Sequence, residues 1–254
     1  MVCAAIASVE AQQWPGVEIV VVDDGSVDGT SATVAARYPA ARLVRLSGLG
    51  PGPARNAGVA AARGDIIMFL DSDDLWLPGH MAALLGVLER GFEVAYGTTR
   101  TVDEVNDSSF CIPEPGEGIE GEALAPLLRW CFLVPSAVAV SRRAFEAGNG
   151  FGAHSFGEDW SFFLHLAARY PFGFAGDEPI TRRRLHHGSL CCLTGRDTIA
   201  AFLARLGEEV LASEWGRPEM AQRFVLMEQW LRDKNQAWTT VQEWYSAMRA
   251  EGMV

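Results

Sequence analysis

The sequence predicts an α/β fold in which helices flank a mostly parallel central sheet. Strand-like and helix-like segments alternate through the first ninety residues, as they do in chains that build parallel sheets. Short uninterrupted apolar runs such as Ile66–Leu70 are typical of strands that are covered on both faces. A helical pattern occupies residues 194–251 and predicts a C-terminal helical extension.

The elements expected in the first half follow from apolar periodicity and from turn residues. Trp14-Pro15-Gly16 ends the first helix, and Pro78 suits the first turn of a later one. Small polar residues over 26–30 can cap the second helix. We expect helices over 1–13, 31–38, 54–62 and 78–90, and strands over 18–22, 42–46, 66–70 and 93–101.

The second half is less regular. Glycine, proline and acidic residues crowd positions 103–122, so an irregular loop or short hairpin is expected there. Beyond it we expect helices over 123–130 and 158–170, a strand over 137–140, an extended basic segment over 179–185, and helices over 194–251 with breaks near 216–218 and 234.

The composition limits the classes of function. The 254 residues carry a net charge of −11, which argues against nucleic acid or an anionic membrane surface as a partner. No run approaches the roughly 18 apolar residues of a membrane span, and the start lacks a signal-peptide pattern. We therefore expect a cytoplasmic protein without a transmembrane segment, with a peripheral position at the inner membrane face as the alternative.

The five cysteines are scattered and lack the spacing of a zinc site. An odd number of unclustered cysteines fits reduced thiols in a cytosol better than a disulfide framework.

Three carboxylates, Asp71, Asp73 and Asp74, follow the strand predicted over 66–70. Residues two apart on an extended chain point the same way, so Asp71 and Asp73 can converge on one ion. A divalent cation would offset their repulsion and their desolvation. Open α/β sheets bind ligands at this end of their strands. The alternative is an acidic loop in water.

Two further acid pairs stand out. Asp23-Asp24 follows the strand over 18–22 and precedes a glycine turn, which repeats the arrangement at Asp71. Glu158-Asp159 opens a predicted helix, where the helix dipole alone would favour acids.

Taken in order, these motifs resemble the family 2 glycosyltransferases of the GT-A fold. The matching segments are 6–12, 18–30 (EIVVVDDGSVDGT), 54–58 (ARNAG), 69–76 (FLDSDDLW), 150–151, 158–160 (EDW) and 184–186 (RLH). The resemblance covers roughly residues 1–192. It implies transfer of a sugar, with inversion, from a nucleotide-diphosphate sugar, of which a UDP-sugar fits best, to a carbohydrate or lipid-linked acceptor in cell-surface polysaccharide or glycoconjugate synthesis.

The resemblance also implies roles for single residues. Asp24, or Asp23 beside it, would bind the nucleoside. Arg55 would lie near the nucleotide, and its alternative is an ordinary surface arginine. Asp159 would be the catalytic base, with Glu158 as its neighbour.

A metal site is implied in the same way. Asp71 and Asp73 look like the family's Asp-x-Asp pair, in which Asp71 contacts the ribose or the metal and Asp73 ligates it. His186 matches a histidine that contacts the metal or the diphosphate, although a lone histidine is more often structural. Hard oxygen ligands suit Mn²⁺ or Mg²⁺.

One departure from the family concerns the start of the chain. The family begins with a strand that precedes its first helix, and here Met1 already falls in that helix. We therefore expect a glycosyltransferase domain over 1–192 that lacks the family's first strand, and a helical extension over 193–254. Two strands should then lack a shared neighbour and expose unpaired backbone groups, unless another segment fills the place.

Other functions compete with glycosyl transfer. A sugar-1-phosphate nucleotidyltransferase needs an N-terminal glycine-rich loop, which this chain lacks. An aspartyl phosphohydrolase could use Asp71 and Asp73, but Asp74 stands where it needs Thr or Val. A nucleotide-sugar-binding relic or partner subunit without turnover is the non-enzyme alternative.

Overall fold

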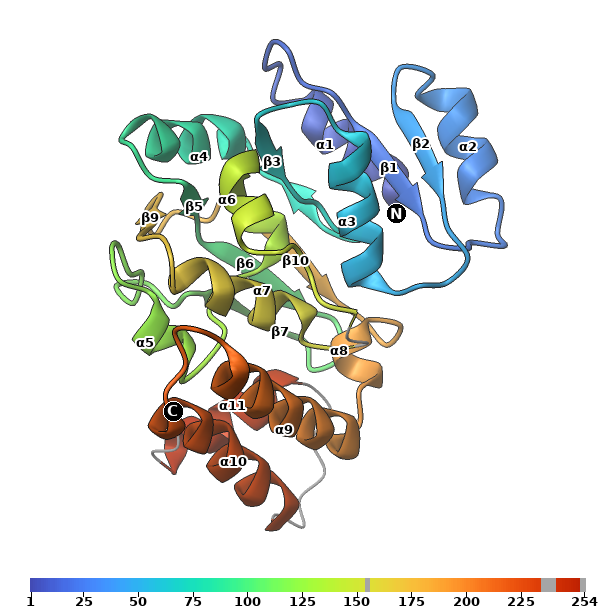
Figure 1. Ribbon diagram of the computed structural model, residues 1–254. Helices are drawn as coiled ribbons and strands as arrows, with labels where there is room; N and C mark the ends of the chain where they lie inside the picture. Colours follow the sequence, from blue (N-terminus) through green and yellow to red (C-terminus); the bar gives the residue numbers. More distant parts are fainter. Residues whose placement is uncertain (154–155, 234–240, 252–254) are drawn as a thin grey trace.

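The structure is a computed structural model that describes residues 1–153, 156–233 and 241–251. The described strands form three sheets, and helices pack around them (Figure 1). The first sheet pairs β1 and β2 in parallel. The second has the order β3-β8-β5-β9, and the third has the order β4-β10-β6-β7. The strands are β1 (Val20–Asp23), β2 (Arg42–Arg45), β3 (Ile66–Met68), β4 (Leu75–Trp76), β5 (Val94–Tyr96), β6 (Thr99–Asp103), β7 (Ser108–Ile112), β8 (Val138–Ser141), β9 (Phe172–Phe174) and β10 (Thr181–Leu185).

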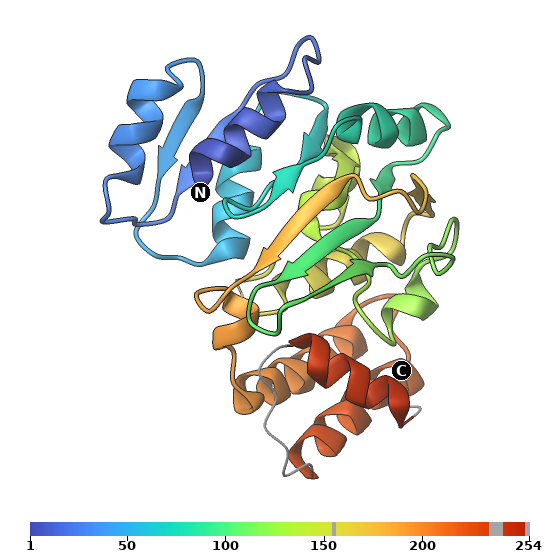
Figure 2. The ribbon, with the colours of Figure 1, turned by 180° about the vertical axis from the view of Figure 1, so that it is seen from behind.

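Helices cover these sheets and form the C-terminal part. They are α1 (Val2–Glu10), α2 (Thr30–Arg37), α3 (Pro51–Ala61), α4 (His80–Glu89), α5 (Leu124–Leu127), α6 (Arg142–Ala147), α7 (Glu158–Ala167), α8 (Leu190–Leu193), α9 (Arg196–Ala212), α10 (Pro218–Asp233) and α11 (Val241–Ala250), with a 3₁₀ turn η1 (Pro135–Ala137). In Figure 1 helix α3 lies in front of β1 and β3, and the view from behind in Figure 2 shows α1 on the opposite face.

The predicted α/β class is confirmed, and the pairing of the strands is more mixed than a mostly parallel sheet. Strand β8 runs antiparallel to both β3 and β5. The segment expected as one strand over 93–101 forms β5 and β6, which belong to different sheets. The hairpin alternative for 103–122 is confirmed in part, because β6 pairs antiparallel with β7.

An inter-strand slot separates β1 from β3. Strand β1 pairs only with β2, and β3 is the edge of its sheet, so the two strands have no shared neighbour in the described part of the chain. A cavity of about 850 Å³ lies between them and is lined by both strands and by α1 and α3, including Ile6, Val21, Gly58 and Ile67. This confirms the expectation of two strands without a common partner.

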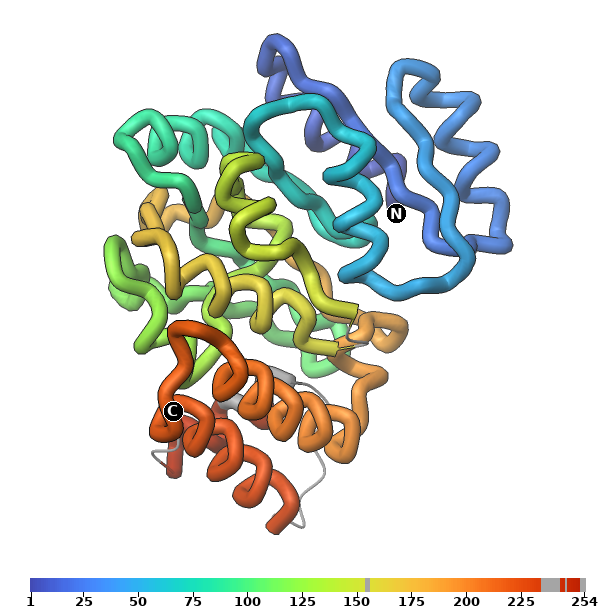
Figure 3. Tube along the Cα trace, in the orientation of Figure 1, coloured from blue at the N-terminus to red at the C-terminus, as the bar shows by residue number. Residues whose placement is uncertain are grey.

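The C-terminal helices α9, α10 and α11 pack beneath the sheets, at the far end from the N-terminus (Figure 3). Their apolar side chains belong to the same core cluster as those of α7 and β5, including Phe202, Phe224 and Trp244. The break expected near 216–218 is confirmed, and the one near Lys234 lies outside the described residues. The division of the chain at residue 192 stays a prediction.

Two further expectations concern single features. No described helix has the length and apolar character that a membrane crossing needs. All five cysteines are free thiols, as expected from their spacing.

Candidate active site

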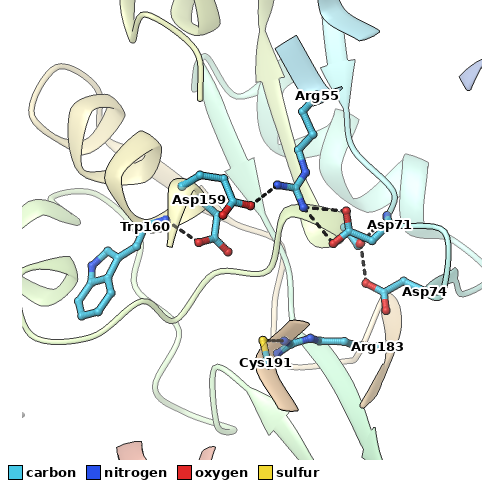
Figure 4. A network of polar contacts seen from close by, with 9 residues as sticks. Arg55, Asp71, Asp74, Asp159, Trp160, Arg183 and Cys191 are labelled. Atoms are coloured by element: carbon cyan, nitrogen blue, oxygen red, sulfur yellow. Dashed lines mark hydrogen bonds and ion pairs between the residues drawn. The ribbon is translucent and has the colours of Figure 1, made fainter. Parts of the chain in front are cut away.

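A cluster of charged side chains lies where β3, α3, α7 and β10 approach one another (Figure 4). Arg55 of α3 is at its centre. One guanidinium nitrogen of Arg55 lies 2.8 and 3.1 Å from the two carboxylate oxygens of Asp71, and the other lies 2.6 Å from Oε1 of Glu158. The side chain is only 14% exposed, so Arg55 is not an ordinary surface arginine.

The electrostatics of Arg55 follow from this position. Burial works to lower the pKa of Arg55, but the charges of Asp71, Glu158 and Asp159 raise it overall. The arginine therefore stays charged and joins the acid after β3 to the acids at the start of α7. Its guanidinium carbon also lies 5.2 Å from the centroid of the Phe151 ring.

The start of α3 lies unusually close to the loop before α7, which allows this bridge. A Cβ at Gly52 would lie 2.2 Å from the carbonyl oxygen of Gly152, so only glycine fits. Asn56, one turn further along, donates to the Phe151 carbonyl (2.8 Å) and accepts from the Phe151 N–H (2.9 Å). These contacts explain why α3 begins at Pro51, three residues before its predicted start.

Asp74, which is not part of the Asp-x-Asp pair, fixes the acid turn formed by residues 71–74 after β3. Asp74 is buried, and its carboxylate accepts from Ser136 Oγ (2.6 Å) and from the Arg184 N–H (3.2 Å). Ser136 Oγ in turn accepts from the backbone N–H of Asp71 (3.0 Å). Burial, and then the charge of Asp71, raise the pKa of Asp74 to about 7. Asp74 therefore ties the turn to β10 and η1.

Asp73 and His186 form a pair on the other side of this turn. His186 Nε2 lies 3.4 Å from Oδ2 of Asp73, and this buried nitrogen makes no hydrogen bond. An unsatisfied imidazole nitrogen beside a carboxylate fits the donor set of a divalent cation. Among the described residues, however, no group of three His, Cys, Asp or Glu side chains could hold a metal ion by itself.

Asp23 and Asp24 lie at the carboxyl end of β1; Asp23 braces the turn that follows it, and Asp24 braces the loop that precedes α3. Asp24 accepts from the N–H groups of Gly48 (2.9 Å), Leu49 (2.8 Å) and Gly50 (2.7 Å). Asp23 accepts from the Ser26 N–H (2.8 Å) and from Ser31 Oγ. The hydrogen bonds from the Ser31 and Ser26 side chains are the main cause of the lowered pKa of Asp23.

Glu158 and Asp159 open α7 at the other side of Arg55. Burial and the charge of Asp159 raise the pKa of Glu158 to about 7, against the effect of Arg55. Burial also raises the pKa of Asp159, and Arg55 opposes this shift. Asp159 Oδ1 accepts from the Trp160 N–H at 2.8 Å. A raised pKa and a position in this cluster suit an acid that accepts a proton.

Arg183 of β10 is a charged residue of the site that the motifs do not include. Its guanidinium donates to the thiol sulfur of Cys191 (3.0 Å), and among the described residues no carboxylate pairs with it within 4 Å. Burial works to lower the pKa of Arg183, but Cys191, Asp74, Asp159 and Asp71 raise it overall. Figure 4 shows Arg183 opposite Arg55, with the carboxylates between them.

The structure brings most of the predicted residues together. Arg55, Asp71 and Glu158 form one network, Asp159 follows Glu158 at the start of α7, and Asp73 pairs with His186. Asp24 lies outside this network and contacts Gly50, the residue that directly precedes α3. Asn56, Ser136 and Arg183 were not predicted as site residues. The period-2 alternation of β10 gives a weak signal for Arg183, because it shares a face with the buried Thr181 and Leu185.

The family model described as glycosyl transferase family 2 matches residues 1–147. This span is more than half of the chain, and the chain belongs to this family.

Two curated relatives and one solved structure are similar to the chain. A succinoglycan biosynthesis protein, ExoO, of Rhizobium meliloti is 49% identical over 150 residues, which are 58% of this chain and 40% of the relative. An uncharacterized glycosyltransferase of Nostoc sp. is 30% identical over 154 residues, 56% of this chain and 47% of the relative. The chain thus spans less than half the length of these two relatives.

The crystal structure of S. aureus TarS 1-349 in complex with UDP-GlcNAc matches with a TM-score of 0.66 and 16% identity, covering 90% of this chain and 68% of that chain. At 16% identity the likeness bears on the fold alone, and it agrees with the GT-A arrangement.

Proposed function

We propose that the chain is the catalytic part of an inverting glycosyltransferase that moves a sugar from a nucleotide-diphosphate sugar to an acceptor hydroxyl. The observation that carries the proposal is the Arg55 bridge between Asp71 and the Glu158–Asp159 pair. This bridge supports Asp159 as the base, because it joins the acid turn after β3 to the helix start that carries Asp159. The relative named for succinoglycan biosynthesis supports a role in polysaccharide synthesis, and the UDP-GlcNAc complex of TarS supports a UDP-sugar as donor.

Asp159 is the proposed base. It accepts the proton of the acceptor hydroxyl while the oxygen attacks the anomeric carbon from the face opposite the diphosphate. Arg55 is hydrogen-bonded to Glu158, the neighbour of Asp159, and the raised pKa of Asp159 strengthens its carboxylate as a proton acceptor.

Asp73 and His186 are the residues that would hold Mn²⁺ or Mg²⁺. When bound there, the ion would act as a Lewis acid and offset the charge that develops on the leaving diphosphate. Asp71, which the Asp-x-Asp pattern offers as a further ligand or as a ribose contact, has both oxygens on Arg55, so we assign it to orienting Arg55 and the ribose.

The remaining contacts to the donor come from two sides. Asp24, or Asp23, accepts from the nucleoside, because a carboxylate offers about four lone-pair sites and Asp24 uses three. Arg183 donates to the diphosphate, since most of its five N–H donors have no partner in the described residues. The acceptor is a carbohydrate or a lipid-linked carbohydrate, and the protein acts in the cytoplasm or at the inner face of the membrane.

Calorimetry with UDP, with and without Mn²⁺, alongside a donor-hydrolysis and transfer assay tests the proposal. We expect metal-dependent UDP binding together with hydrolysis or transfer. Binding without either reaction would instead support the alternative of a nucleotide-sugar-binding relic or partner subunit. A folded sample that fails to bind UDP under both conditions would contradict both.

A further inference from the structure

We propose that helix α9 is a positioning element for the Glu158–Asp159 turn, and that Phe202 is its principal positioning residue. The inference rests on the proposed function, because the turn matters for catalysis only where Asp159 is the base. It assigns a role to the C-terminal helices, whose sequence carries no motif of its own.

Phe202 occupies the space beside the residue that directly precedes the two acids. Gly157 is the N-cap of α7 and has φ 76°, in the left-handed region. A Cβ at Gly157 would lie 2.3 Å from Cζ of Phe202 and 2.5 Å from two further atoms of its ring. The Phe202 ring therefore touches the backbone at the point where the chain turns into α7, and glycine is required for this approach.

The same ring also contacts the residues on both sides of the turn. Phe156 packs against Phe202 edge to face, with ring centroids 5.7 Å apart, and Trp160 lies 6.0 Å from it. Phe224 of α10 supports Trp160 from a further side at 5.7 Å. Phe202 is 1% exposed, so it has no freedom to move away from these neighbours without opening the core.

Polar contacts fix the following turns of α7 to the same helix. Glu209 of α9 accepts from Ser161 Oγ at 2.6 Å, and its Oε1 lies 2.8 Å from Nε2 of His165. Helix α9 thus contacts the chain on both sides of the acid pair, before it at Phe156 and Gly157 and after it along α7. Trp160 is also fixed by a hydrogen bond outside α9, because its Nε1–H donates to the Leu127 carbonyl at 2.7 Å.

We expect this packing to affect the rate of sugar transfer and to leave the affinity for the donor unchanged. A base must lie within hydrogen-bond reach of the proton that it accepts, and a displacement of about 1 Å can reduce the rate about 100-fold. Removing the Phe202 ring leaves a space beside Gly157 into which the turn can relax. The contacts proposed for the donor, at Asp73, Arg183 and His186, lie on other elements.

The test compares Phe202→Ala and the milder Phe202→Leu with Leu231→Ala, in the full chain. Leu231 is also buried in the C-terminal helices, but it lies seven residues, or about 10 Å along α10, from Phe224. Hydrogen exchange of residues 156–165 is measured in each protein, together with kcat and UDP affinity well below the melting temperature.

We expect both Phe202 variants to speed exchange in 156–165 and to lower kcat, by at least about tenfold for Phe202→Ala, with UDP affinity within threefold of the parent. Leu231→Ala should change neither. Should Phe202→Ala fail to fold, Phe202→Leu and Gly157→Ala, which forces the turn away from the ring, give the same comparison.

Unchanged exchange in 156–165, or an equal change in Leu231→Ala, would overturn the inference. A parent protein without transfer activity contradicts the proposed function instead, and the exchange measurement still decides whether α9 holds the turn.

Discussion

Asp159 lies at the start of α7 with one carboxylate oxygen on the Trp160 N–H, so its second oxygen is the one available to an acceptor hydroxyl. Asp159→Asn keeps the shape of the side chain and removes its basicity. We expect this variant to lower transfer by at least about 100-fold, the range typical of general acid–base catalysis, while UDP–metal affinity stays within a few fold. Near-normal turnover in a radiolabelled-donor assay would show that Asp159 is not the base.

Substitution of Arg183 tests whether this residue contacts the donor. We expect Arg183→Ala to weaken UDP binding about tenfold or more, because a hydrogen bond to a charged group contributes about 1.5–3 kcal/mol. Arg182→Ala is the matched control, since Arg182 is the neighbouring residue of β10 and is exposed. Calorimetry that gives both variants the same UDP affinity would remove Arg183 from the donor site.

The acids of the site could be predicted from the sequence, and their partners could not. Asp71, Asp73 and Asp159 stand directly after a strand or at the start of a helix, so local pattern is enough to find them. The partnership of Arg55 with Glu158 spans 103 positions, and that of Asn56 with Phe151 spans 95. Such contacts depend on how α3 packs against the loop before α7, which no local pattern encodes.

Helix α4 begins with a buried histidine, so we expect its packing to depend on pH. His80 begins this helix, is fully buried, stacks on Trp76 with centroids 4.2 Å apart, and has Nδ1 3.1 Å from the Ile180 carbonyl oxygen. Burial lowers the pKa of His80 to about 4, partly opposed by that carbonyl. The folded protein therefore holds this imidazole neutral.

The sign of the pH dependence follows. Between the unfolded value of 6.5 and about 4, the unfolded chain binds a proton at His80 and the folded chain does not, so stability falls as the pH falls. We expect His80 to contribute a loss of about 2 kcal/mol between pH 7 and pH 5. In urea unfolding, His80→Phe should lose less stability than the parent by about this amount, and the exposed His187→Gln should behave as the parent does. Parallel pH curves for His80→Phe and the parent would contradict this.

The elements that the sequence misses share a physical cause, which is that tertiary pairing overrides local preference. The extended basic segment expected over 179–185 contains β10, but its central place in the sheet, paired with both β4 and β6, has no signal in the local sequence. Strand β8 was predicted as a strand, but its antiparallel direction depends on the long connection that precedes it. Strand β4 has two residues, too few for any periodicity.

For the whole molecule, the inter-strand slot predicts that an added strand would stabilise the fold. Met1 Sδ lies 2.8 Å from a guanidinium nitrogen of Arg184 on β10, so α1 starts near the carboxyl ends of the strands. We expect five β-branched residues fused ahead of Met1 through a short turn to pair with β1 and β3. Each kcal/mol gained raises the melting temperature by about 2–4 °C in a chain of this size, and a rise of at least about 5 °C is expected.

The matched control is a fusion of equal length in which aspartate and proline replace alternate residues, because neither fits an apolar slot nor pairs as an inner strand. Equal melting temperatures for the two fusions, measured by scanning calorimetry, would mean that the slot does not accept a strand.

The inter-strand slot also divides the proposed donor site between two sheets whose described strands are not hydrogen-bonded to each other. On one side of it β1 ends at Asp23, which Asp24 follows, and on the other side β3 leads to Asp71 and Asp73. No backbone hydrogen bonds of the described strands join the two sides, so the span between nucleoside and diphosphate contacts is set by how α1 and α3 lie across them. A donor that contacts residues on both sides would then cross-link the two sheets. Its binding would reduce the motion of the β1–β2 sheet relative to the β3 sheet.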